Sequence, residues 1–390
     1  MDENRRKKIV IHCASGIENS GDEAILKVLL NRYTPDFDVT VISLNARNTA
    51  VMFESMPVTV LGNSDHACAE AIRSCDVFIL GGGGLLQDKT TIFNVLRWLS
   101  KLKMAIKLNK KTCIYANSIG ELNYAYNRKK VGSTLKKVDL ITLRDEMSKV
   151  LLHCLGVTEQ VYVTADPVFS LPPPDEEYAR RKVSLLNLPE TYICICVRHW
   201  YDTHPLIPVK IATRLKIRNK KNIAMYMRYV ETLAQTVDRI NENLDLPVVF
   251  LSMCHGRDAS VAEDILLRTK NAKKNVIVNE PSMQPETYLS VIMRSRALLG
   301  MRLHSLIYAG NVATPAVALI YQDKVLGLVE EAGLEHVHVD SMSVEELYTK
   351  LEEVLKDSEA KKQSIVAFHK SMKQRESQNI SLFRALISKE

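Results

Sequence analysis

The chain has 390 residues, of which 46% are apolar and 25% charged; these ordinary globular values exclude a disordered chain. A chain of this length favours two domains of about 150 to 200 residues each. Its net charge of +7 (52 Lys and Arg against 45 Asp and Glu) favours anionic partners, and charge alone leaves nucleic acid, lipid headgroups and phosphorylated small molecules open.

Neither a membrane span nor a secretory signal is predicted. No apolar stretch approaches the roughly 20 residues that a membrane helix needs. The N-terminus, MDENRRKKIVIHC, has only a strand-length apolar run and so lacks the apolar core of a signal peptide. The eight cysteines are scattered without a CxxC pair, which is typical of buried thiols in a reducing compartment. We therefore expect a soluble, cytoplasmic protein.

The first half of the chain alternates strands and helices as a doubly wound parallel sheet does. Apolar runs predict strands at residues 8–13, 38–43, 58–61, 76–80, 112–116, 138–143 and 161–163. The first strand leads through a loop of small residues into a predicted helix whose first turn contains Asp22 and Glu23. One of these carboxylates could act as a base toward a sugar hydroxyl, although helix capping and the helix dipole explain them equally well.

Four glycines at residues 81–84 follow the strand predicted at 76–80, in the sequence GGGGLLQD. Without Cβ atoms the backbone can approach a phosphate, carboxylate or sugar closely and turn its N–H groups inward. The run matches neither GxGxxG nor the P-loop pattern, which disfavours dinucleotide and P-loop sites. We therefore predict a ligand-binding loop that leads into a helix over residues 90–108, with a tight chain reversal or close helix packing as the alternative.

Arg144 ends the strand predicted at 138–143, at the sheet edge where open α/β sheets bind ligands. An ion pair with Asp145 or a helix cap is the alternative. Further on, the sequence LPPPD at residues 171–175 is typical of a stiff interdomain connection. We predict an N-terminal Rossmann-like domain over residues 1–171, a linker over 172–190, a second Rossmann-like domain over 191–358, and a C-terminal helical segment over 359–390 that packs back on the first domain.

The second half repeats the pattern. Strands are predicted at residues 192–197, 247–253, 275–278, 297–300 and 315–319, and helices at 222–241, 259–269, 286–294 and from 344 to 386. Three of these strands end in side chains that suit an anion: Arg198, then Arg302, His304 and Ser305, and finally Lys324. Strand ends and helix N-termini present donors to anions, so we predict an anion site, with a structural arginine and a hydrogen-bonded histidine as the alternative.

Two successive doubly wound domains that face a cleft are the architecture of GT-B folds. Within that class the chain resembles the polysaccharide pyruvyl transferase family, in its CsaB-like branch. The matching stretches are GDEAIL at 21–26, GGGGLLQD at 81–88, Arg144-Asp145 with Ser148, TADPVF at 164–169 and GMRLHS at 300–305. The chain departs from the family at 117–120, NSIG, where such proteins usually have more glycine and proline.

The resemblance implies transfer of pyruvate from phosphoenolpyruvate to a sugar, commonly as a 4,6-linked ketal on a lipid-linked precursor of a cell-wall, capsular or exopolysaccharide, with release of phosphate. Phosphoenolpyruvate carries a carboxylate and a phosphate on one small frame, so its site needs several fixed cations. A histidine that titrates near neutrality suits the proton transfer. The expected partners are phosphoenolpyruvate, the glycan and an anionic membrane surface at the inner face of the cell membrane, and no nucleic acid.

Three sets of site residues follow. The predicted catalytic residues are Arg144, His304 and Lys324, and the predicted donor-binding residues are Arg302, Arg198 and Ser305. The candidates for acceptor binding or for the base are Asp22, Glu23, Gly82, Gly83, Gly84, Asp88 and Asp166. We predict no cofactor, since phosphoenolpyruvate is a co-substrate, and no metal, since the sequence has no ligand cluster at metal spacing.

Two other functions fit the same sequence. A GT-B glycosyltransferase that uses a nucleotide sugar would share the fold, the glycine run and the cations, but would release a nucleoside diphosphate. A glycan- or lipid-binding protein without activity would also keep the fold, but should tolerate the loss of His304.

Overall fold

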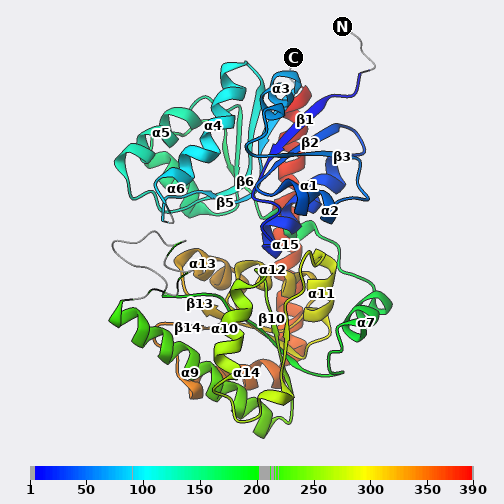
Figure 1. The fold of residues 1–390 in the computed structure, drawn as a ribbon, viewed down its shortest axis with the longest axis vertical. Helices are drawn as coiled ribbons and strands as arrows, with labels where there is room; N and C mark the ends of the chain where they lie inside the picture. The colour runs from blue at the N-terminus through cyan, green and yellow to red at the C-terminus, as the bar shows by residue number, and fades with distance from the viewer. Residues whose placement is uncertain are drawn as a thin grey trace. The chain divides into compact units, whose positions relative to one another are not determined.

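Figure 1 shows a computed structural model of the chain, which describes residues 5–89, 91–201, 211, 215, 217 and 219–388. The chain divides into two compact units. The first unit comprises Met1–Leu171 and Met372–Glu390, and the second unit comprises Pro172–Ser371. Each unit contains one parallel sheet alternating with helices, so the two Rossmann-like halves predicted from the sequence are confirmed.

The first unit is built on an eight-stranded sheet among its described residues. Its strands are β1 (Lys8–His12), β2 (Asp38–Ser43), β3 (Val58–Gly62), β4 (Val77–Leu80), β5 (Gly83–Leu86), β6 (Lys111–Ile119), β7 (Leu140–Leu143) and β8 (Val161–Val163). The order is β3-β2-β1-β4-β6-β7-β8, with β5 beside β6. The order reverses between β1 and β4, and in doubly wound sheets a ligand binds at that switch point.

Helices alternate with these strands. They are α1 (Ser20–Tyr33), α2 (Ala46–Met52), α3 (Ala67–Ser74), α4 (Phe93–Lys107), α5 (Ala125–Leu135), α6 (Glu146–Cys154) and the 3-10 turn η1 (Pro167–Ser170). α6 begins where it does because Asp145 caps it, accepting a hydrogen bond from Ser148 N at 2.7 Å. The apolar faces of α3, α4 and α5 bury Trp98 and its neighbours against the sheet.

The second unit repeats the doubly wound order, β11-β10-β9-β12-β13-β14. Its strands are β9 (Ile193–Cys196), β10 (Val248–Leu251), β11 (Val276–Val278), β12 (Ala297–Gly300), β13 (Ala316–Ile320) and β14 (Glu335–His338). Its helices are α7 (Glu176–Leu185), α9 (Lys220–Asn243), α10 (Arg257–Leu266), η2 (Ala272–Lys274), α11 (Pro285–Met293), α12 (Leu303–Asn311), α13 (Asp323–Ala332) and α14 (Val344–Lys356). Within the described part of the chain, no helix is long and apolar enough to cross a membrane.

Three segments differ from the sequence-based expectation. The glycine run was predicted as a loop, but Gly83–Leu86 form β5, because glycines can pair wherever a neighbouring strand, here β6, supplies the partner groups. The segment predicted as a linker, 172–190, contains α7, which Asp175 caps and which packs against α11. Strand β14 and helix α13 were not predicted.

The last helix, α15 (Ser358–Ser388), returns the chain to the first unit, as the sequence led us to expect. The return begins at Met372. The buried carboxylate of Glu376 accepts hydrogen bonds from Arg32 at 2.8 and 3.1 Å, and Asn379 Oδ1 accepts one from Thr164 Oγ1 at 2.8 Å. Buried polar pairs of this kind fix the helix in one register, because a shift would leave each group unpaired.

Candidate functional site

The loop between β1 and α1 encloses the carboxylate of Glu23. Gly16 N donates a hydrogen bond of 2.7 Å to Glu23 Oε1, and the Glu23 side chain is only 1% exposed. Gly16 has a φ of 80°, and a Cβ at this position would lie 2.2 Å from a backbone oxygen, so the loop requires glycine. Burial raises the pKa of Glu23 to about 8, against the opposing effect of the Gly16 amide. Glu23 is therefore held inside the protein in its neutral form at neutral pH.

Asp22, one residue earlier, faces the glycine run. Asn19 Nδ2 donates to Asp22 Oδ2 at 2.5 Å, and the Asp22 side chain is half-buried. Gly83 has a φ of 103°, and a Cβ there would lie 2.9 Å from Asp22 Oδ1. Gly82 is buried, whereas Gly84 is exposed. The structure thus brings together two predicted motifs that lie 60 residues apart in sequence, and of the two acids Asp22 is the more accessible.

Asp88 is held by hydrogen bonds from residues at the start of α5. Its buried carboxylate accepts hydrogen bonds from Asn123 N at 2.7 Å, Tyr124 N at 3.2 Å and Asn127 Nδ2 at 3.0 Å. These donors lie at the start of α5, so Asp88 fixes the beginning of that helix. This environment favours a positioning role over the acceptor binding that was predicted for it.

Arg144 pairs with Asp166, the acid of the TADPVF stretch, and both side chains are buried. Its Nε donates to Ser118 Oγ at 2.6 Å, and Ser118 Oγ in turn donates to Asp145 Oδ2 at 2.6 Å. The structure therefore pairs Arg144 with Asp166 and not with Asp145, which caps α6. Two residues predicted as separate parts of the site, Arg144 and Asp166, are one ion pair.

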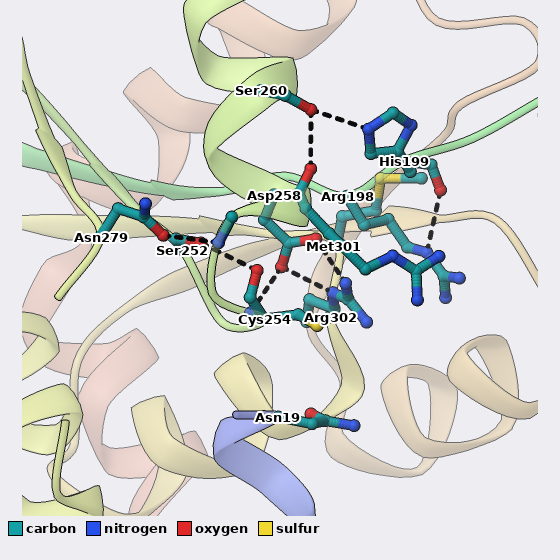
Figure 2. Close-up of polar contacts among 12 residues, drawn as sticks. Asn19, Arg198, His199, Ser252, Cys254, Asp258, Ser260, Asn279, Met301 and Arg302 are labelled. Carbon is teal, nitrogen blue, oxygen red and sulfur yellow. Dashed lines mark hydrogen bonds and ion pairs between the residues drawn. The ribbon is translucent and has the colours of Figure 1, made fainter. Parts of the chain in front are cut away.

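In the second unit, Arg302 forms a bidentate pair with Asp258 (Figure 2). Arg302 Nε donates to Asp258 Oδ2 at 3.0 Å and Nη2 donates to Oδ1, while Cys254 N donates to the same carboxylate at 3.0 Å. Burial by itself would lower the pKa of Arg302, but the Asp258 carboxylate raises it above its ordinary value. The positive charge predicted to be available for a donor is thus compensated inside the protein.

Arg198 has a different environment. Its Nε donates to His199 O at 3.3 Å, and its guanidinium lies 4.3 Å from the ring centre of Tyr321 and 5.8 Å from that of Trp200. Among the described residues, no carboxylate forms a salt bridge with it. Burial lowers the pKa of Arg198, and the nearby charge of Arg302 acts in the same direction. The Arg198 side chain is half-buried, and its charge is not paired by a carboxylate as those of Arg302 and Arg144 are.

The helix that follows Arg302 carries the remaining predicted residues. Arg302 precedes α12 in extended backbone, and His304 and Ser305 lie in the first turn. Ser305 Oγ donates to Arg302 O at 2.6 Å, and His304 is half-buried. Lys324 lies in the first turn of α13, and its side chain is outside the described part of the structure.

Sequence reasoning missed two residues of this region. Asp258 lies in the first turn of α10, and its pairing with Arg302 joins positions 44 residues apart. Ser260, on the same helix, lies 2.8 Å from His199 Nε2 (Figure 2). In the described residues, no group of three or more His, Cys, Asp or Glu side chains is placed to hold a metal ion. Each unit thus has charged and hydrogen-bonding side chains at the switch point of its own sheet.

Comparison with solved structures finds the same fold in other proteins. Anabaena HepE in complex with UDP-glucose superposes with a TM-score of 0.63 at 10% identity, over 97% of this chain and 98% of HepE. A glycosyltransferase from Rickettsia africae gives a TM-score of 0.63 at 12% identity, over 99% and 100% of the two chains. A UDP-GlcNAc 2-epimerase from Methanocaldococcus jannaschii gives 0.59 at 14%, over 90% and 93%. At such identities the likeness shows the fold alone, which is of the GT-B class.

Comparison of sequences is more specific. The amylovoran biosynthesis protein AmsJ of Erwinia amylovora is 22% identical over 289 residues, which are 70% of this chain and 64% of AmsJ, so the match spans just under two thirds of that relative. The family model of the polysaccharide pyruvyl transferases matches residues 19–323. That range contains both switch points, from Asp22 beside Gly83 to the Arg302–Asp258 pair. It also covers well over half of the sequence, and the chain therefore belongs to the polysaccharide pyruvyl transferase family.

Proposed function

We propose that the protein transfers the pyruvyl group of phosphoenolpyruvate to two hydroxyls of one sugar in a polysaccharide precursor, forming a cyclic ketal and releasing phosphate. The observation that carries this proposal is Arg198, a half-buried guanidinium without a carboxylate salt bridge among the described residues. It lies close enough to Arg302, the residue before α12, for the two charges to interact. Arg302 and Arg144 are compensated by Asp258 and Asp166, so Arg198 is the arginine with charge available for the donor. Membership of the family supports the transferase chemistry.

The proposed reaction balances without a cofactor. A proton adds to C3 of phosphoenolpyruvate and converts the methylene into a methyl group, which leaves C2 electron-poor. One sugar hydroxyl bonds to C2, the C2–O bond to phosphate breaks, and the second hydroxyl bonds to the same carbon. Of the two protons lost by the hydroxyls, one balances the proton gained by C3 and the other leaves with the phosphate. Each step is proton transfer or displacement, which side chains can catalyse.

We assign each site residue a role in the reaction from the contacts that surround it. Arg198 binds the donor anion, because charge-assisted hydrogen bonds from a planar guanidinium suit both carboxylate and phosphate. His304, at the N-terminus of α12, delivers the proton to C3, and Lys324 assists the departing phosphate. In the first unit, Asp22 beside Gly83 is the base toward the acceptor hydroxyl, while Glu23 is enclosed and neutral. Arg144 with Asp166 shapes the site.

The test is incubation of the purified protein with phosphoenolpyruvate and a panel of lipid-linked and soluble glycans. Mass spectrometry would detect the added pyruvyl group, and a colorimetric assay would measure inorganic phosphate. Release of phosphate in step with pyruvylation is the expected result. Turnover of nucleotide sugars with release of a nucleoside diphosphate, and none of phosphoenolpyruvate, would assign the alternative glycosyltransferase function.

Two further parts of the proposal concern the need for a metal ion and the place where the protein acts. We infer that no metal ion is required, so that a chelator leaves activity unchanged; a strict need for magnesium or manganese would contradict this. We also infer that the acceptor is lipid-linked and that the protein works at the cytoplasmic face of the membrane. The basic character of the chain supports this location, since an anionic leaflet attracts basic surfaces. Assignment to the CsaB-like branch stays a prediction.

A further inference from the structure

One segment of the chain carries a larger net positive charge than the chain as a whole. Residues 89–138 contain twelve Lys and Arg and a single acid, Glu121, a net charge of +11 in a chain whose total is +7. The rest of the chain is therefore acidic on balance. Lys89 pairs with Glu121 at 3.0 Å, which leaves the segment's other cations without an acid from the same segment. Charge concentrated in this way creates a local field that the whole-chain value conceals.

The segment contains the helices α4 and α5, which lie side by side on the first unit (Figure 1), with strand β6 between them in the sequence. Seven of its twelve cations lie on these two helices. Asn127 Nδ2 donates to Ile92 O at 3.0 Å and joins the starts of the two helices. Lys130 Nζ lies 5.2 Å from the ring centre of Tyr126 on α5. Burial lowers the pKa of Lys103 on α4, and the charge of Lys130 lowers it further, so cations of both helices share one surface.

Aromatic side chains stand among these cations. Phe93 at the start of α4 is 69% exposed, and Tyr124 and Tyr126 at the start of α5 are 49% and 53% exposed. Exposed rings beside exposed cations give this surface a mixed apolar and basic character. We call the surface formed by Phe93, Arg97 and Lys103 of α4 and Tyr126, Lys129 and Lys130 of α5 the basic–aromatic face.

We propose that the basic–aromatic face docks the protein on an anionic phospholipid leaflet. Aromatic rings insert favourably at the boundary between headgroups and acyl chains, and lysines beside them attract anionic headgroups, the combination that interfacial helices use. The absence of acids from α4 and α5 supports this occupant, because charge complementarity to an anionic surface is unopposed along both helices. The inference rests on surface chemistry and is independent of the pyruvyl transfer proposed above, although a lipid-linked acceptor would explain it.

Binding of the full chain to sedimenting vesicles tests the proposal without any substrate. We expect binding to phosphatidylcholine vesicles that contain about 30% phosphatidylglycerol, weakened by salt, and little binding to pure phosphatidylcholine. Each basic residue near an anionic leaflet raises partitioning about fivefold, so the double variant Lys129→Glu with Lys130→Glu should bind at least about 25-fold more weakly. Phe93→Ser should weaken binding with its salt dependence unchanged, because it removes insertion and no charge.

The matched control is Arg180→Glu with Arg181→Glu, which makes the same change of net charge at exposed positions of α7 in the second unit. It should bind vesicles like the unmodified chain. Circular dichroism and thermal unfolding verify the fold of all variants. Because the substituted side chains lie at the surface, the spectrum and the unfolding temperature should stay unchanged. Equal binding to neutral and anionic vesicles, or an equal loss in the control, would overturn the proposal. So would tighter binding to single-stranded RNA that the same two lysine substitutions abolish, since the face would then serve nucleic acid.

Turnover separates this inference from the proposed function. The Lys129→Glu and Lys130→Glu variant should keep its activity on a short soluble glycan and lose activity on a vesicle-embedded acceptor. Vesicle binding without turnover of phosphoenolpyruvate would leave docking in place and remove the proposed function. Turnover of phosphoenolpyruvate with no vesicle binding would keep the proposed function and overturn the docking proposal.

Discussion

Glu23→Gln tests whether the enclosed acid of the first unit is neutral in the folded protein. Glutamine has the size and shape of glutamate and can still accept the hydrogen bond that Gly16 N donates at 2.7 Å, but it cannot ionise. Burial raises the pKa of Glu23 from an ordinary value of 4.5 to about 8. The variant therefore removes an ionisation that the fold opposes, and little else.

The sign and the size of the expected change in the free energy of unfolding follow from the linkage between protonation and folding. Because the folded pKa is raised, the stabilisation from proton binding is complete below pH 4.5 and is lost as the pH rises to about 8. A difference of roughly 3.5 pKa units at about 1.4 kcal/mol each corresponds to about 5 kcal/mol. Relative to the glutamine variant, the native chain should lose this stability between about pH 4.5 and 8, and about 3 kcal/mol of it by pH 7.

Urea unfolding followed by tryptophan fluorescence at about pH 5, 7 and 9 would measure the free energies of unfolding. The gap between variant and native chain should widen steadily with pH in favour of glutamine. Glu121→Gln, at an exposed carboxylate, is the matched control for loss of one charge. A gap that does not change with pH would refute the reasoning, because Glu23 would then ionise as easily in the folded chain as in the unfolded one.

Four further substitutions separate the roles in the second unit and at β1. Arg302→Ala leaves Asp258 buried and unpaired, so the free energy of unfolding should fall by about 3 to 5 kcal/mol, and adding Asp258→Ala should restore part of it. Arg198→Ala should leave stability unchanged but raise KM for phosphoenolpyruvate roughly 10- to 200-fold, and an unchanged KM would exclude Arg198 as the donor receptor. His304→Gln should lower kcat by roughly 10² to 10⁴ while donor binding persists; a normal kcat would make His304 a binding residue only. Burial lowers the pKa of His12 from 6.5 to about 3, so stability is lost as the pH falls through that range, and His12→Gln should abolish this loss in the same unfolding assay.

The strands of the fold were predictable because a buried parallel strand is a short apolar run. The segments at Asp38–Ser43, Val161–Val163 and Ala297–Gly300 coincide with their predicted ranges, and the other predicted strands overlap theirs. Strand β5 was not predictable, since glycine disfavours strands and only the neighbouring β6 makes Gly83–Leu86 pair. Helix α7 was hidden by the prolines before it, although Asp175 is a cap that could have indicated its start.

The positions of the site residues were predictable, but their partners were not. Strand ends identified Arg144, Arg198 and Arg302, because in a doubly wound sheet the carboxyl ends face the ligand. Nothing in a single sequence pairs Arg302 with an acid 44 residues away, or Arg32 with Glu376 at a separation of 344 residues. Periodicity reports which face a side chain occupies within its own element, whereas an ion pair depends on how distant elements pack.

The partners change what the three arginines can do. Arg302 precedes α12 and Asp258 lies in the first turn of α10, so their buried pair joins the starts of two helices at the edge of one sheet. A pair with no spare charge contributes little attraction to a donor, but it fixes the backbone from which His304 projects. Arg302→Ala should therefore lower kcat through the displaced histidine, whereas Arg198→Ala acts on KM, since Arg198 has no carboxylate within the described residues to satisfy it.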